Sequence, residues 1–93
     1  MRQFADSLRV STDGPLYVSV DIDVLDPAFA PGVSHREPGG LSVRQLLTLI
    51  QSLGGPIIGA DVVELNPQRD PDGTTARVAA KITKELVARM LAD

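Results

Sequence analysis

The sequence contains no cysteine, no tryptophan and a single histidine, His35. The absence of cysteine excludes disulfides and thiolate metal sites. It also suits a reducing compartment, so we predict a cytoplasmic protein. No apolar stretch approaches the ~18 residues of a membrane-spanning helix, and the N-terminal residues lack the apolar core of a signal peptide. We therefore predict that the protein has no membrane partner.

An excess of charge of one sign is also missing, because 9 basic and 12 acidic residues give a formal net charge of -3. A nucleic-acid surface needs a basic face, so we predict no nucleic-acid partner. The chain is 43% hydrophobic and 23% charged, which is ordinary for a soluble globular protein. Its 93 residues form at most one domain.

Two mostly apolar segments alternate with two amphipathic segments along the chain. The apolar segments predict buried strands, and the amphipathic segments predict helices with one apolar stripe each. In chain order, the expected elements are the end of a helix at 2–9, a turn at 11–15, a strand at 16–22, a helix at 42–53, a strand at 56–65 and a helix at 74–91. Proline and glycine in residues 26–40 predict an ordered loop.

This strand, helix, strand, helix order predicts an α/β fold with parallel strands joined by a right-handed crossover. Two parallel strands that are apolar on both faces do not make a self-sufficient sheet. Roughly three or more strands, with helices on both sides, are normally needed. We therefore predict that the chain is one end of a larger sheet, either as a segment of a longer enzyme or completed by another chain.

Acidic residues follow both predicted strands. Asp21 and Asp23 end the first strand and Glu64 ends the second. On an extended backbone, Asp21 and Asp23 lie on the same face, where two like charges need a cation, a proton or a basic partner. Ligands of open parallel sheets bind at the carboxyl ends of the strands, so we expect all three carboxylates at one rim. Carboxylate oxygens favour hard cations such as magnesium, calcium or manganese, although two carboxylates are too few for a closed site.

The bare Asp-x-Asp pattern leaves two other interpretations open. It can be a pair that caps a loop, without a ligand. Residues 18–25 also match the haloacid-dehalogenase phosphohydrolase signature, in which Asp21 would be the nucleophile and Asp23 a general acid beside magnesium. That chemistry needs a lysine at a later strand end, whereas Lys81 and Lys84 lie within the last predicted helix.

Three longer segments resemble one family in order and at fitting spacing. They are Ser-Val-Asp-Ile-Asp-Val-Leu-Asp-Pro-Ala-Phe-Ala-Pro-Gly at 19–32, Glu-Pro-Gly-Gly-Leu at 37–41 and Gly-Ala-Asp-Val-Val-Glu-Leu-Asn-Pro at 59–67. These segments closely resemble the C-terminal third of the ureohydrolases, which include arginase, agmatinase, guanidinobutyrase and formimidoylglutamase. The Val-Ser-His-x-Glu-Pro-Gly-Gly-Leu version and the later Asn-Pro-Gln-Arg-Asp look most like the plant-type arginase branch and its bacterial relatives.

The resemblance implies that residues 1–93 are the C-terminal segment of a ureohydrolase domain, part of a three-layer α/β/α fold with a parallel sheet. It implies a binuclear manganese centre and hydrolysis of a small guanidino substrate, arginine or agmatine, to urea and an amine. Asp21 and Asp23 match the metal-binding pair of the family, and Glu64 matches the acidic residue on the guanidinium side. The chemistry is consistent, because a guanidine carbon is a poor electrophile and two metals can activate the attacking water.

The family's other metal ligands, in a Gly-Gly-Asp-His segment and an Asp-x-His-x-Asp segment, are missing here. His35 occupies a position where many members have threonine, so it either lines the pocket or is an exposed loop residue. We expect that the chain alone does not assemble the two-metal site. It then acts as part of a complete enzyme, with the remainder of that enzyme or as a homo-oligomer, or it is a truncated, non-catalytic α/β module. Asp61 is predicted to be structural, and Arg69 and Asp70 are predicted to form a solvated loop pair.

Overall fold

The computed structural model describes residues 14–92, so the predicted helix end at 2–9 and the start of the following turn lie outside the described residues. Strands β1 (Leu16–Asp21) and β2 (Ile57–Val63) alternate with helices α2 (Val43–Ser52) and α3 (Thr74–Ala92). The predicted strand, helix, strand, helix order is therefore confirmed. Both strands are shorter than predicted, and β2 ends immediately before Glu64.

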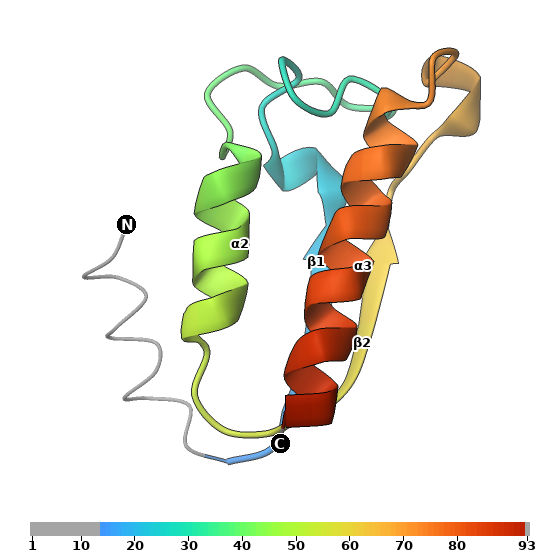
Figure 1. The fold of residues 1–93 in the computed structure, drawn as a ribbon. Coiled ribbons are helices and arrows are strands. Elements are labelled where there is room, and N and C mark those ends of the chain that lie inside the picture. The colour runs from blue at the N-terminus through green and yellow to red at the C-terminus, as the bar shows by residue number, and fades with distance from the viewer. Residues whose placement is uncertain (1–13, 93) are drawn as a thin grey trace.

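The two strands pair in parallel, as the sequence predicts, and they end at the same level. Val20 lies opposite Val62, and Asp21 lies opposite Val63. Both helices cover one face of this sheet, and α3 runs along β2 (Figure 1). Because the strands end together, the residues that follow them meet at one edge of the sheet.

Within residues 14–92, one hydrophobic core lies between the sheet and the helices. Val18 and Val20 of β1 and Ala60 and Val62 of β2 contribute to it from the sheet. The helices contribute Leu46, Leu47 and Ile50 of α2 and Ile82 and Leu86 of α3. Alternation along the strands sends the other side chains to the opposite face, which neither helix covers. The described residues thus form two of the three layers that an α/β/α fold contains.

Asp61 joins two residues of β1 on the sheet face opposite α2 and α3. Its carboxylate accepts hydrogen bonds from the Ser19 hydroxyl at 2.6 Å and from the Tyr17 hydroxyl at 3.0 Å. The hydrogen bond to Asp61 and the nearby negative charge raise the pKa of Tyr17. The Tyr17 ring also occupies the space beside Gly59, where a Cβ would lie 2.8 Å from it. The structural role predicted for Asp61 is confirmed.

Helix α2 starts with a capping box. The Ser42 hydroxyl accepts from the Gln45 amide at 3.0 Å, and the Gln45 side chain accepts from the Ser42 amide at 3.0 Å. These two bonds satisfy backbone donors that a helix start otherwise leaves without partners. At the other end of the core, Arg89 of α3 donates to the carbonyl oxygen of Ile50 at 2.7 Å and fixes the helices to each other.

The prediction of a solvated pair at Arg69 and Asp70 is wrong for Asp70. This residue is only 8% exposed. Its carboxylate accepts from the amides of Thr75 and Ala76, both at 2.9 Å, and so caps the start of α3. The unsatisfied amides of a helix start attract a carboxylate more strongly than a neighbouring exposed arginine does.

Candidate metal and substrate site

The first strand turns as soon as it reaches the site. Asp21 is the last residue of β1, and a short 3-10 helix, η1 (Ile22–Val24), follows directly. The Asp21 carboxylate accepts from the Asp23 amide at 3.1 Å and caps this turn. Ile22 and Leu25 are 0% and 1% exposed, because the turn drives both into the core. The expected extended backbone through Asp23 is therefore wrong, and the two carboxylates are brought together by a capped turn.

Asp23 nevertheless sits among the predicted site residues. A side-chain hydrogen bond with Asp21 raises the pKa of Asp23, and partial desolvation and the negative charges of Asp21 and Glu64 raise it further. The imidazole of His35 lowers the pKa of Asp23. Asp21 lies opposite Val63 in the sheet, so Asp21 and Glu64 follow each other across the same carboxyl end, and Asp23 lies two residues after Asp21. The role of these three carboxylates in one site stays a prediction.

Glu64 is held in a conformation that glutamate rarely adopts. Its φ of 77° is in the left-handed region, where no other non-glycine among residues 14–92 is found. Such a backbone costs about 1–3 kcal/mol and persists only where the surroundings fix it. The sequence predicts Glu64 at the end of an extended strand and gives no indication of this turn.

The left-handed turn is fixed by Asn66, two residues further on. The Asn66 amide donates to the Gly32 carbonyl oxygen at 2.8 Å. Its side-chain NH2 donates to the Ser34 hydroxyl at 3.0 Å, and its side-chain oxygen accepts from the Gln68 amide at 3.1 Å. Asn66 thereby caps a second 3-10 helix, η2 (Pro67–Arg69), and attaches it to the loop before α2. The Asn-Pro sequence is a capping signal, but nothing in it indicates the partners at 32 and 34.

Arg69 completes this attachment. Its guanidinium donates to the carbonyl oxygens of Val33 at 3.4 Å and Ser34 at 3.3 Å. We call Asn66 and Arg69, with the backbone of residues 32–34 that they bind, the loop clamp. The clamp joins the segment that carries Glu64 to the segment that carries His35. His35 itself is exposed.

Asp26 holds the loop that leaves Asp23. Its carboxylate accepts from the amides of Ala28 and Gly39, both at 2.9 Å, and these bonds lower the pKa of Asp26. Gly40 packs directly on this turn, since a Cβ there would lie 2.6 Å from the carbonyl oxygen of Val24. Asp26 therefore fixes the turn that follows it and ties this turn to the Glu-Pro-Gly-Gly segment through Gly39.

The donors at the rim are suited to a hard cation but do not enclose one. Among the described residues, no group of three or more His, Asp or Glu side chains could hold a metal ion. The rim does present carboxylate oxygens, the ligands that manganese shares with magnesium and calcium. The raised pKa of Asp23 also reflects a crowding of negative charge that a cation would compensate. Asp21 and Asp23 thus present oxygen ligands of the kind that hard cations prefer.

A sequence model of the arginase family matches residues 1–88. The chain belongs to the arginase family. Arginase 1 of Arabidopsis thaliana, named as mitochondrial, is 60% identical over 76 residues, or 81% of this chain and 22% of that protein. Guanidinopropionase of Pseudomonas aeruginosa is 49% identical over 84 residues, or 89% of this chain and 26% of that protein.

The solved structure of arginase from Medicago truncatula matches with a TM-score of 0.82 at 50% identity, over 96% of this chain and 29% of that one. The similarity to plant arginases and bacterial relatives and the arginase-like α/β fold are therefore confirmed. The chain spans about a quarter of the length of the curated relatives it matches. No helix within residues 14–92 has the length and apolar character needed to cross a bilayer.

Proposed function

We propose that this chain supplies part of the active site of a manganese-dependent ureohydrolase that converts a small guanidino compound, arginine or agmatine, to urea and an amine. The main support is the rim itself. In a member of the arginase family, Asp21, Asp23 and Glu64 lie at the carboxyl ends of two paired parallel strands, and Asp21 and Glu64 both raise the pKa of Asp23. This chain would be the C-terminal segment of the enzyme. The remaining metal ligands would come from other parts of that enzyme.

In this proposal each residue of the rim has a separate task. The carboxylates of Asp21 and Asp23 hold manganese, which when bound supplies an activated water for attack on the guanidine carbon. Glu64 accepts hydrogen bonds from the planar guanidinium and orients it, a geometry to which a carboxylate is well matched. Asp26 keeps the Asp23 turn in place, and the loop clamp keeps Glu64 in place. His35 lines the entrance to the pocket.

We further propose a cytoplasmic enzyme that works as a homo-oligomer or together with the remainder of the ureohydrolase.

The phosphohydrolase alternative has no support at the rim. Lys81 and Lys84 are exposed on α3, and Lys81 pairs with Glu85 at 3.5 Å. Neither lysine follows a strand, where that chemistry would need one.

A chimera tests the function directly. This chain replaces the matching segment of the Medicago truncatula arginase, and urea release from arginine and agmatine is measured with and without manganese. We expect manganese-dependent release from the chimera and none from the 93-residue chain alone. Asp21→Asn should lower release by more than about 100-fold, since even residues that only support metal ligands typically contribute 10- to 100-fold.

Glu64→Gln should mainly raise KM, by about 10- to 100-fold, because a hydrogen bond to a charged group contributes about 1.5–3 kcal/mol. Asp72→Asn is the control, since Asp72 accepts from the Thr74 amide at the start of α3 and follows η2, whereas Glu64 precedes it. A folded chimera without urea release would support the non-catalytic module instead.

A further inference from the structure

Residues 35–38 are all exposed and form a short arch between two anchored ends. The loop clamp holds the first end of this arch. Asn66 and Arg69 both donate to Ser34, Asn66 to its hydroxyl at 3.0 Å and Arg69 to its carbonyl oxygen at 3.3 Å. Because Asn66 lies two residues after Glu64, the arch starts beside the segment that carries Glu64.

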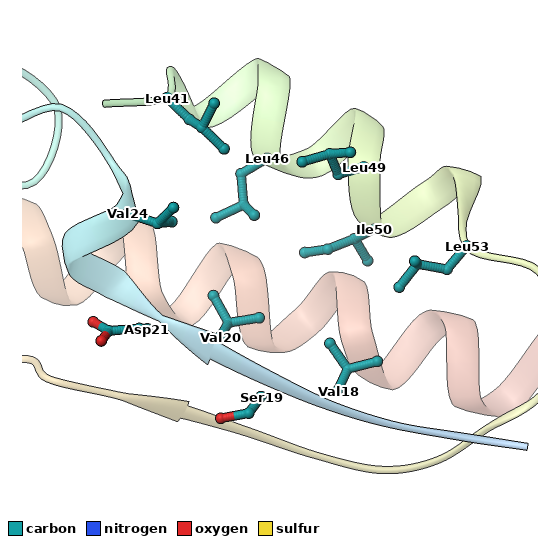
Figure 2. A pocket seen from close by; sticks show the side chains of 10 residues that line it. All are labelled: Val18, Ser19, Val20, Asp21, Val24, Leu41, Leu46, Leu49, Ile50 and Leu53. Atoms are coloured by element: carbon teal, nitrogen blue, oxygen red, sulfur yellow. The ribbon is translucent and has the colours of Figure 1, made fainter. Parts of the chain in front are cut away.

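The second end of the arch is anchored to the turn that follows β1. The Gly39 amide donates to the Asp26 carboxylate at 2.9 Å, and Gly40 packs on the carbonyl oxygen of Val24. Val24 belongs to η1, the turn that Asp21 caps (Figure 2). The arch therefore runs from the segment after β2 to the turn after β1, across one end of the sheet (Figure 1).

His35, the first residue of the arch, is a hydrogen-bonding group at this rim with no protein partner. Its imidazole makes no hydrogen bond or ion pair within residues 14–92. The next residue differs, because the Arg36 guanidinium donates to the carbonyl oxygens of Pro31 at 2.5 Å and Arg69 at 3.4 Å and so braces the arch. His35 also lies near enough to Asp23 to lower the pKa of that carboxyl. The imidazole is thus held at the rim and remains available to a ligand.

A substrate that is bound at both strand ends brings its tail to the arch. In the proposed function, Glu64 orients the guanidinium beside the metal held by Asp21 and Asp23. Ligands of parallel sheets lie outside the carboxyl ends of the strands, so the aliphatic tail leaves the rim past the arch. This tail ends in a carboxylate, an ammonium or both. An imidazole has at least one N–H for a carboxylate in either protonation state, whereas it accepts from an ammonium only when it is neutral.

We propose that His35 is a specificity-determining residue, whose imidazole donates a hydrogen bond to the carboxylate of a guanidino-acid substrate. This inference rests on the proposed function. It favours arginine over agmatine, because agmatine lacks the carboxylate. The anchoring of the arch at both ends supports this role, since a group that is already fixed loses less conformational freedom when the substrate binds.

Three related substrates test this role in the chimera with the Medicago truncatula arginase. Arginine has a carboxylate and an amine, agmatine lacks the carboxylate, and δ-guanidinovalerate lacks the amine. We expect His35→Ala to lower kcat/KM for arginine and δ-guanidinovalerate by about 10- to 100-fold, because a hydrogen bond to a charged group is lost. The loss should fall mainly on KM, as the carboxylate is remote from the reacting carbon. The value for agmatine should not change.

His35→Gln keeps a side-chain N–H donor and should restore part of the loss. Gln68→Ala is the control, because Gln68 is also exposed and only its backbone amide takes part in the loop clamp. Circular dichroism checks the folding of all variants. Equal losses for the three substrates, the same change in Gln68→Ala, or no restoration by His35→Gln would overturn the inference.

A chimera that releases no urea would overturn the proposed function, and calorimetric binding of arginine and agmatine then tests His35. A preference for arginine that is lost in His35→Ala would retain the carboxylate site. Equal binding of the two compounds, or a preference that survives in His35→Ala, would overturn it.

Discussion

The ends of β1 and β2 reach the same rim by opposite means. At the end of β1, Asp21 caps its own turn and Asp26 closes the following loop, with partners within 13 residues along the chain. At the end of β2, Glu64 has a left-handed backbone. It is held through Asn66, whose partners at Gly32 and Ser34 are more than 30 residues away. The end of β1, which we propose binds metal, is thus locally determined, whereas the end of β2, which we propose binds substrate, depends on tertiary contacts.

The comparison predicts that the loop clamp is the vulnerable part of the site. Gly32→Ala should have the largest effect, because its Cβ would lie 2.6 Å from the Cβ of Asp70 and 2.9 Å from that of Thr75. Overpacking of this buried contact costs about 1–3 kcal/mol. Chemical denaturation followed by circular dichroism measures the loss. Gly14→Ala is the control, since nothing lies within 4 Å of a Cβ there. Equal stability of the two variants would show that the loop clamp accommodates the added Cβ without destabilising the fold.

Asn66→Ala should destabilise the chain by about 1–2 kcal/mol, because it removes a cap and a side-chain hydrogen bond. In the active chimera it should also raise KM, since Glu64 would no longer be fixed. Gln68→Ala is the control, as the structure uses the backbone amide of Gln68 in this contact. A loss of stability with an unchanged KM would mean that Asn66 supports the fold but does not position Glu64.

Glu64→Gly and Glu64→Ala separate the strain from the charge. Both remove the carboxylate, but only glycine adopts the left-handed backbone freely. We expect the glycine variant to be more stable than the alanine variant by about 1 kcal/mol, after allowing for the flexibility of unfolded glycine. Equal unfolding midpoints would contradict the strain, and a crystal structure of the alanine variant would then show whether φ has changed sign.

The same difference explains what the sequence could predict. The capping box at Ser42, the Asp-x-Asp pair and the Asp26 turn depend on neighbours a few residues away, so short patterns indicate them. The position of Glu64 was predictable because parallel strands end together. Its left-handed turn was not, because Asn66 and Gly32 meet only in the folded chain. The burial of Asp70 was not predictable for the same reason. Its polar loop packs against Gly32, which is distant in the sequence.

The smallest predicted effect is the loss of the Asp26 contribution to stability at low pH. Backbone amides hold the pKa of Asp26 below its usual value near 3.8. A carboxyl group with a lowered folded-state pKa stabilises the fold fully above the unfolded-state pKa, and this contribution is lost as the pH falls through the folded-state value. The stability difference between the wild-type chain and Asp26→Asn should therefore be constant above about pH 5 and shrink below about pH 4. Unfolding midpoints of both proteins between pH 3 and 7 measure this stability difference. A difference that stays constant down to pH 3 would mean that the hydrogen bonds of Asp26 do not depend on its charge. Asn66→Ala changes no titrating group, so its destabilisation should remain the same over this range, which distinguishes the charged local turn at β1 from the neutral clamp at β2.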